Sequence, residues 1–391
     1  MKKYRSKTLL LAGFLGSALL FSACAEKHVS TSSISTTPAG TGAETHSVKI
    51  TQDDSEKAVD TEPAEVPPKA GLIRSSLTHE WITEDAEAQR PLACMFPTDK
   101  KAQPQYGIDR AEILYEILEE GDMSRQMMII KDWKDLNRIG NFRSIRDYYV
   151  QTGLEWDPIF LHAGGPEVFV KEILTRKDVD NINGVGGPMG PDYGAYFRIP
   201  EGSRSEHTLY SDASHLQKAL EKSGFQSTHR DFYVANHFRF SHGDTVNDLS
   251  DYANAFPAAV IDMSGSFPVS KSTYTYNPED HQYYRSMYNT AQRDAISGNQ
   301  LHFANVLVEA CYWGDRGLSY KLFQTIDSGR HGYFFTEGKM IPVTWKKTSE
   351  YEPTRFYDAN GQEIRLNTGR TAINIIRDGT DYFLVDGTRY E

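Results

Sequence analysis

Basic residues and glycines along residues 143–207 have the types and spacing of an anion-binding site. Arg143 and Arg146 are three residues apart, so a helix would place them on one face. His162 ends an apolar run, and two glycines follow it. Arginine grips phosphate or carboxylate bidentately, glycine-exposed amides at a helix start attract anions, and histidine exchanges a proton near neutrality. We predict an anion-binding site from these residues, with His162 as candidate acid or base: Arg143, Arg146, His162, Gly164, Gly165, Arg204 and His207.

Each of these residues also has a structural interpretation. Arg143 could pair with Glu155 or Asp147, His162 could bond a backbone carbonyl, and the glycines could only form a turn. Arg125 follows an acidic turn at the start of another strand, which places it at the opposite sheet edge unless segment 121–125 folds back. The sequence leaves both interpretations open.

The elements that must position this site alternate between strands and helices. Apolar runs predict strands over 91–96, 125–130 and 159–163, and helical spacing predicts helices over 109–119, 143–156, 168–174 and 213–222. Such alternation indicates a mainly parallel sheet with helices on both faces, where ligands bind at the carboxyl ends of the strands.

From about residue 237 onward, apolar residues recur at every second position instead of at helical spacing. Turn signals such as Glu337-Gly338 and Asn360-Gly361 separate short strands, which is typical of antiparallel sheets. The predicted strands cover 258–263, 272–276, 282–288, 303–310, 318–324, 332–335, 341–347, 354–358, 363–366 and 372–376. The expected fold class is α+β, with an N-terminal α/β layered domain (77–235) on a mainly parallel sheet and a C-terminal, mainly antiparallel β domain (236–391).

The N-terminus has the order of a lipoprotein signal. Four basic residues among the first seven precede an apolar run, which ends in Ser22-Ala23-Cys24. We predict a signal peptide over 1–23 and a diacylglyceryl lipid on Cys24. An uncleaved transmembrane anchor is the alternative, but Thr8 to Ala23 is shorter than the roughly 20 residues that span a bilayer. The predicted location is therefore the extracytoplasmic face of the cell membrane, with the lipid anchor as the membrane contact.

Residues 24–76 are expected to be a disordered tether. Between Ala25 and Lys69 the chain is rich in Ser, Thr, Ala and Glu and poor in aromatics, so it cannot bury a core.

Composition excludes several classes of function. The 42 basic and 53 acidic residues give a net charge of −11, which argues against nucleic-acid binding. His229, His237 and His242 lack the close spacing of a zinc site, so no metal is predicted, and no cofactor motif is present. Cys94 and Cys311 lie in apolar runs and are expected to be free, buried thiols.

Several stretches resemble the YerB-like family of bacterial lipoproteins. They are RPLACMFPTDKKAQPQYGIDRAEILYEILEEGDMSRQMMI, FRSIRDYYVQ and FLHAGG, then NPEDHQYYR, NQLHFANVLV and the long stretch from GYFFTEGKM to AINII. The resemblance implies two domains and an envelope location, but no reaction. Two departures are Glu206-His207-Thr208 after Arg204, where the family reads Pro-His-Asn, and Thr371-Ala372-Ile373, where it carries a Trp.

Two function classes fit these patterns. In the first, an envelope lipoprotein binds an anionic small molecule or an envelope protein. In the alternative, a hydrolase or transferase acts on a phosphorylated or carboxylated envelope molecule, with His162 as acid or base. No recognisable nucleophile motif accompanies the histidine in the sequence, which favours the first class.

Overall fold

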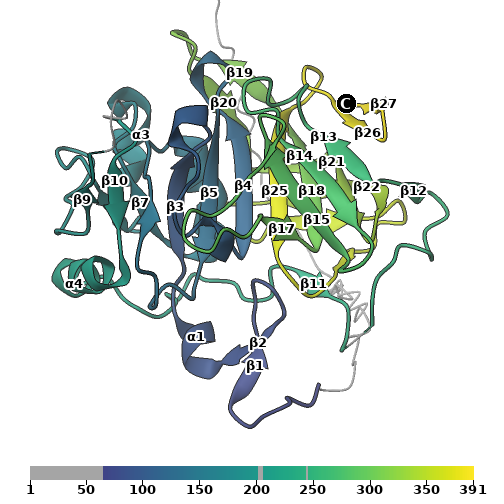
Figure 1. The fold of residues 1–391 in the computed structure, drawn as a ribbon, viewed down its shortest axis with the longest axis horizontal. Helices are drawn as coiled ribbons and strands as arrows, with labels where there is room; N and C mark the ends of the chain where they lie inside the picture. Colours follow the sequence, from purple (N-terminus) through teal and green to yellow (C-terminus); the bar gives the residue numbers. More distant parts are fainter. Residues whose placement is uncertain (1–64, 201–205, 244) are drawn as a thin grey trace, which may run out of the picture. The chain divides into compact units, whose positions relative to one another are not determined.

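One mixed sheet of eleven strands takes strands from both halves of the chain (Figure 1). The computed structural model describes residues 65–200, 206–243 and 245–391, called the folded body below. The strands lie in the order β12-β22-β21-β18-β25-β4-β5-β3-β7-β8, with β23 beside β22. Their bounds are β3 Leu92–Pro97, β4 Ile113–Leu118, β5 Ser124–Ile130, β7 Ile159–His162, β8 Asn181–Asn183, β12 Phe256–Pro257, β18 Asn305–Cys311, β21 Asp327–Thr336, β22 Lys339–Lys347, β23 Arg355–Tyr357 and β25 Thr371–Arg377.

The two halves meet inside this sheet. β25, near the C-terminus, runs parallel to β4, from the pair Thr371 and Ile113 to the pair Ile375 and Ile117. The N-terminal and C-terminal parts of the folded body therefore contribute adjacent strands and share one set of ladder hydrogen bonds.

The N-terminal part of the sheet is mixed rather than mainly parallel, which corrects the prediction. β7 runs parallel to β3 and to β8, whereas β5 is antiparallel to both β3 and β4. The predicted helix over 109–119 caused the error. Apart from a short 3₁₀ turn at Ile108–Arg110, that segment forms β4, which is buried along its whole length. A strand covered on both faces is apolar throughout, so periodicity alone cannot distinguish it from a helix.

The described residues form four α-helices: α1 Glu84–Ala88, α2 Asp147–Gly153, α3 Glu167–Leu174 and α4 Ala213–Ser223. They also form the short 3₁₀ turns η1 Lys100–Ala102, η2 Ile108–Arg110, η3 Glu120–Asp122 and η4 Leu154–Trp156. The predictions over 168–174 and 213–222 are confirmed as α3 and α4. α4 begins where the Asp212 side chain accepts the His215 N–H at 2.8 Å, and it ends at Gly224 with φ 71°. The predicted helix over 143–156 is shorter, because the backbone N–H groups of Phe142, Arg143 and Ile145 donate to the carbonyls of Leu209, Met95 and Gly164 instead.

A second, seven-stranded sheet packs beside the first and is antiparallel throughout, as predicted for the C-terminal half. Its strands are β13 Val260–Asp262, β14 Thr273–Asn277, β15 Gln282–Met287, β16 Thr290–Ala291, β17 His302–Phe303, β26 Phe383–Val385 and β27 Thr388–Tyr390. Smaller ladders join β1 Leu72–Arg74 to β2 Trp81–Thr83, β10 Leu209–Ser211 to β6 Ile139–Gly140 and β9 Phe197–Arg198, β11 Arg239–Phe240 to β24 Arg365–Leu366, and β19 Trp313–Asp315 to β20 Lys321–Phe323.

β1 also corrects the predicted end of the tether at residue 76. Leu72, Ile73 and Arg74 pair with β2, so the fold begins before that boundary. The predicted signal peptide and Cys24 lie outside the described residues. Within the folded body, no helix is long and apolar enough to cross a membrane.

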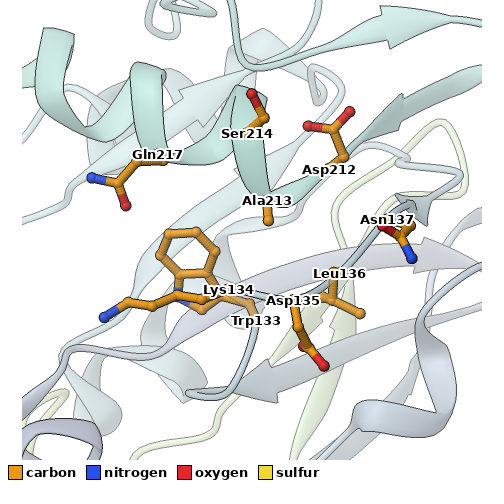
Figure 2. A pocket seen from close by; sticks show the side chains of 9 residues that line it. All are labelled: Trp133, Lys134, Asp135, Leu136, Asn137, Asp212, Ala213, Ser214 and Gln217. Carbon is orange, nitrogen blue, oxygen red and sulfur yellow. The ribbon is translucent and has the colours of Figure 1, made fainter.

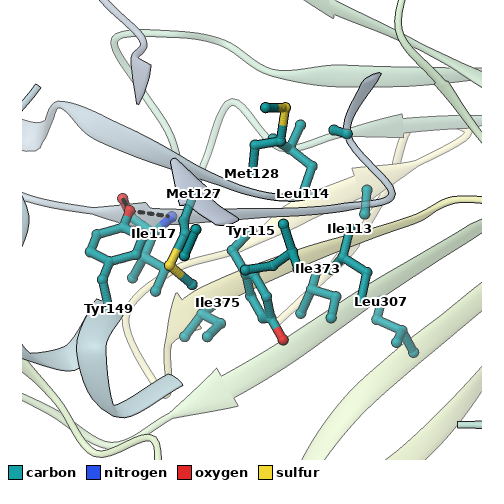
Figure 3. Close-up of a cluster of buried hydrophobic side chains, with 14 of the residues drawn as sticks. Ile113, Leu114, Tyr115, Ile117, Met127, Met128, Tyr149, Leu307, Ile373 and Ile375 are labelled. Carbon is teal, nitrogen blue, oxygen red and sulfur yellow. Dashed lines mark hydrogen bonds between the residues drawn. The ribbon is translucent and has the colours of Figure 1, made fainter. Parts of the chain in front are cut away.

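The hydrophobic core beneath α2 combines strands from both halves (Figure 3). Tyr115 of β4 stands opposite Ile373 of β25 on one side and Met127 of β5 on the other. The buried Tyr149 of α2 accepts the backbone N–H of Ile117 at 3.1 Å, which ties the helix to the sheet. Cys94 and Cys311 are buried and free, as predicted.

Candidate functional site

The segment 141–146 lies against the carboxyl ends of β3 and β7. The Arg143 N–H donates to the Met95 carbonyl at 3.0 Å, and the Arg143 carbonyl accepts the Ala163 N–H at 2.9 Å. The Ile145 N–H donates to the Gly164 carbonyl at 3.0 Å. The structure thus brings Arg143 to the edge where β7 ends with His162, as the sequence predicted, although through a loop and not through a helix.

His162 has a structural role there, which corrects its predicted role as ligand and acid or base. Its side chain is fully buried, Nδ1 lies 2.9 Å from the Gly164 carbonyl, and Nε2 lies 3.1 Å from the Asn181 Oδ1. Burial lowers the pKa of His162, against the effect of these two hydrogen bonds. With both nitrogens engaged and no exposed surface, the ring positions the turn after β7.

Gly164 and Gly165 allow close backbone packing, which corrects their predicted role as a source of amides for an anion. The Gly164 N–H donates to the Asn183 Oδ1 at 2.8 Å, so this amide is already used. A Cβ on Gly165 would lie 2.8 Å from the Ile145 carbonyl oxygen and 2.8 Å from a methyl of Val170. Only glycine lets the loop approach α3 this closely.

Arg146 is part of a buried ion-pair network, which corrects its predicted role in ligand binding. Its guanidinium lies 2.9 Å from Glu119 and pairs bidentately with Glu120, while Glu119 also pairs with Arg125. Burial alone would lower the pKa of Arg146, but the hydrogen bonds to Glu120 and the charge of Glu119 raise it. Arg125 was expected at the opposite edge of the sheet, but β5 runs antiparallel to β3 and places Arg125 opposite Pro97, at the carboxyl end of β3.

Replacing Arg146 by alanine is therefore expected to destabilise the protein. Arg146 is 6% exposed, and its loss would leave Glu120 without its cation. Breaking a buried pair costs about 3–5 kcal/mol, and the partial exposure of Glu120 reduces this to roughly 2–4 kcal/mol. Urea unfolding checks the value, with Arg389→Ala, at an exposed pair with Glu391, as the control. A loss no larger than that of the control would restore the ligand-binding interpretation.

Three buried nitrogen groups near this network have no hydrogen-bond partner among the described residues. They are the Arg143 Nε, the His207 Nδ1 and the Arg125 Nη1. His207 is 2% exposed, and burial lowers its pKa. The negative charges of Asp99 and Glu206 raise this pKa, whereas the positive charges of Arg143 and Arg125 lower it further. The two guanidinium groups thus share one electrostatic neighbourhood with the imidazole. Arg204, also predicted here, lies outside the described residues.

Glu206 covers this group from the solvent side. Its carboxylate lies 3.4 Å from the Arg143 Nη2 and 3.9 Å from the His207 Nε2, and 64% of its side chain is exposed. Its backbone carbonyl accepts from the Arg143 Nη1 at 3.2 Å. We call Arg125, Arg143 and His207 the donor cluster. The sequence identified two of its members.

A separate cavity of about 620 Å³ lies between α4 and the segment 133–137 (Figure 2). None of the predicted site residues lines it. Among the described residues, no group of three or more His, Cys, Asp or Glu side chains could hold a metal ion.

Comparisons with known proteins identify the family. Residues 77–226 match the N-terminal domain, and residues 263–373 the C-terminal domain, of the family described as "Protein of unknown function (DUF3048)". The chain is 26% identical over 321 residues to "Putative lipoprotein YerB" of Bacillus subtilis, covering 80% of this chain and 89% of that protein.

A solved structure gives the same result for the fold. The crystal structure of the YerB protein from Bacillus subtilis superimposes with a TM-score of 0.66 at 22% identity, covering 78% of this chain and 97% of that chain. The order of the two matched domains agrees with the resemblance seen in the sequence. The chain belongs to the YerB-like family of two-domain proteins, in which the curated relative is named a lipoprotein.

Proposed function

We propose that this protein is a lipoprotein held at the extracytoplasmic face of the cell membrane by a lipid on Cys24, and that its folded body binds a small anionic ligand at the donor cluster. One observation carries the second part: three buried N–H groups or ring nitrogens, on Arg125, Arg143 and His207, have no partner in the folded body. Buried polar groups are nearly always hydrogen-bonded, so unused ones grouped together call for an acceptor.

An anion suits these groups better than a neutral acceptor. Two of the three belong to guanidinium groups, whose hydrogen bonds to phosphate or carboxylate are charge-assisted. Glu206 already offers a carboxylate to Arg143, at the long distance of 3.4 Å and from an exposed side chain. A ligand anion could take that place without leaving a buried charge behind.

Binding fits better than catalysis. The alternative hydrolase or transferase assigned proton transfer to His162, which is buried and has both nitrogens hydrogen-bonded. A general acid or base must reach the reacting proton within hydrogen-bond distance, which the closed position of His162 does not allow. The alternative would therefore need His207 in that role.

Inorganic phosphate tests the proposal. We expect phosphate to raise the melting temperature of the full chain in detergent, because a ligand that binds only the folded state stabilises it. Arg143→Gln should remove the shift. Arg110→Gln is the matched control, since the side chains of Arg110 and Arg143 are 27% and 25% exposed and both pair with carboxylates. Equal shifts in all three proteins would contradict binding at the donor cluster.

The lipid anchor has its own test. Cys24→Ala removes the thiol that takes the diacylglyceryl group, so we expect loss of lipid labelling and either release from the membrane fraction or an unprocessed precursor. Metabolic labelling with a fatty acid, followed by membrane fractionation, measures both. Unchanged labelling of the variant would rule out lipidation at Cys24.

A further inference from the structure

Two cavities join along one side of α4, away from the donor cluster. The first, of about 620 Å³, lies beside the start of the helix, and the second, of about 470 Å³, extends to its end. They share Trp133, Lys134 and Gln217 as lining residues, so together they form one groove, called the α4 groove. Figure 2 shows its first part, where the indole of Trp133 lies between Lys134 and the helix.

Trp133 supplies the groove with an unused buried donor. Its side chain is 3% exposed, and its indole N–H has no hydrogen-bond partner among the described residues. A buried tryptophan N–H usually finds an acceptor. Because Trp133 lines both cavities, a ligand in the groove is the natural source of that acceptor.

Two side-chain amides provide acceptors in the same groove. Gln89 donates its amide to the Lys131 carbonyl at 2.8 Å, and Gln217 donates to Glu221 at 2.9 Å. Neither amide oxygen has a partner within the folded body, so both can accept from a ligand. The groove thus offers a donor at Trp133 and acceptors at Gln89 and Gln217.

The far end of the groove has an apolar part. Leu92 of β3 and Ile159 of β7 form part of its wall, and Leu220 and Phe225 close it. Leu92 and Ile159 are almost fully buried, whereas Leu220 and Phe225 are half-buried. An aliphatic group of a ligand would be transferred here from water to a largely desolvated apolar surface, which favours binding.

We propose that the α4 groove binds an extended peptide segment of a protein partner, with one apolar side chain in the Leu220 end. Peptide bonds alternate donors and acceptors, as the free groups on Trp133, Gln89 and Gln217 require. A saccharide fits less well, because sugar rings pack on exposed aromatic faces and Trp133 exposes only 3% of its surface. The charged groups that line the groove are Lys134, Arg90, Asp135, Asp212 and Glu221. Arg90 is already paired with Asp157 and Asp180, so the balance does not favour an anion.

Indole resonances test this directly. The chain has five tryptophans, so ¹⁵N-tryptophan labelling of the full chain in detergent gives a simple spectrum, in which Trp133→Phe identifies the Trp133 signal. The probes are the L-peptides N-acetyl-Ala-Leu-Ala-amide and N-acetyl-Ala-Gly-Ala-amide, with cellotriose as a saccharide. We expect the leucine peptide to shift the Trp133 signal saturably and to bind about tenfold more tightly than the glycine peptide.

Variants of exposed or half-buried residues complete the test. Leu220→Ser should weaken the leucine peptide by about tenfold and abolish its advantage over the glycine peptide, whereas Lys218→Ala, on α4 but outside the groove, should change nothing. Three results would each overturn the proposal: a Trp133 signal that the leucine peptide does not move, a shift produced by cellotriose alone, or binding unaffected by Leu220→Ser. The test does not involve the donor cluster, so it stands apart from the proposed anion site.

Discussion

Replacing Arg285 by methionine is expected to lower the free energy of unfolding by about 3–5 kcal/mol, the cost of leaving a buried charge unpaired. Arg285 of β15 and Glu116 of β4 are 0% and 1% exposed, and their side chains form an ion pair between the two sheets. Arg285 also donates to the Ser272 hydroxyl at 2.8 Å and to the Tyr274 hydroxyl at 3.2 Å.

The remaining partners of Glu116 do not replace that charge. The hydroxyls of Ser124, Ser270 and Ser272 donate to its Oε1, the last two at 3.1 and 3.0 Å, but they are neutral. Urea unfolding measures the loss, with Arg389→Met at an exposed pair as the control. Adding Glu116→Gln to the Arg285→Met variant should recover part of the loss, because the stranded charge is then gone. If the double variant instead loses as much free energy of unfolding as the two single variants together, or more, packing and not charge dominates at this contact.

Replacing Glu309 by glutamine is expected to stabilise the protein in alkaline solution. Glu309 of β18 is 3% exposed, and no described residue donates a hydrogen bond to its carboxylate. The nearby ammonium of Lys347 lies 2.8 Å from Glu155 instead, which also accepts from Thr354 and Tyr115. Burial, with a further contribution from the charge of Glu155 and against that of Lys347, raises the pKa of Glu309 to about 8.

The sign of the pH dependence follows from this raised pKa. Between the ordinary value of 4.5 and about 8, the folded protein keeps a proton on Glu309 that the unfolded chain releases. The contribution of Glu309 to the free energy of unfolding is therefore fully present below pH 4.5 and is lost as the pH rises through about 8. The full difference corresponds to about 3–5 kcal/mol.

Thermal or urea unfolding of the wild type and of Glu309→Gln across this pH range measures the effect. The two proteins should differ little at pH 5 and most at pH 9, with the variant more stable. Glu172→Gln, at an exposed position of α3, is the control and should follow the wild type at every pH. Parallel pH curves for wild type and Glu309→Gln would show that Glu309 keeps an ordinary pKa in the fold.

Local signals in the sequence determined much of the secondary structure. The strands at 91–96, 125–130 and 159–163 appear as β3, β5 and β7, because apolar runs bounded by turn residues leave few alternatives. The hairpin at Glu337-Gly338 is confirmed: β21 ends at Thr336, β22 begins at Lys339, and both turn residues have positive φ. Such a turn requires that backbone, which a Gly signals directly.

What the sequence could not determine was which partners the polar residues would find. Glu116 falls within the helix predicted over 109–119 but lies inside the sheet, because its apolar neighbours are buried on both faces by segments far away in the chain. Arg146 and His162 had the residue types of a binding site, yet Glu119, Glu120 and Asn181 engage them fully.

The sequence by itself therefore determined the element types, the buried thiols and the approximate place of the candidate site. Only the tertiary structure decided that β25 inserts next to β4, that Arg125 joins Arg143 and His207, and that the indole N–H of Trp133 remains unused beside a cavity. The physical reason is range: helix and strand periods are properties of a few consecutive residues, whereas hydrogen-bond satisfaction and desolvation depend on groups brought together from distant positions in the chain.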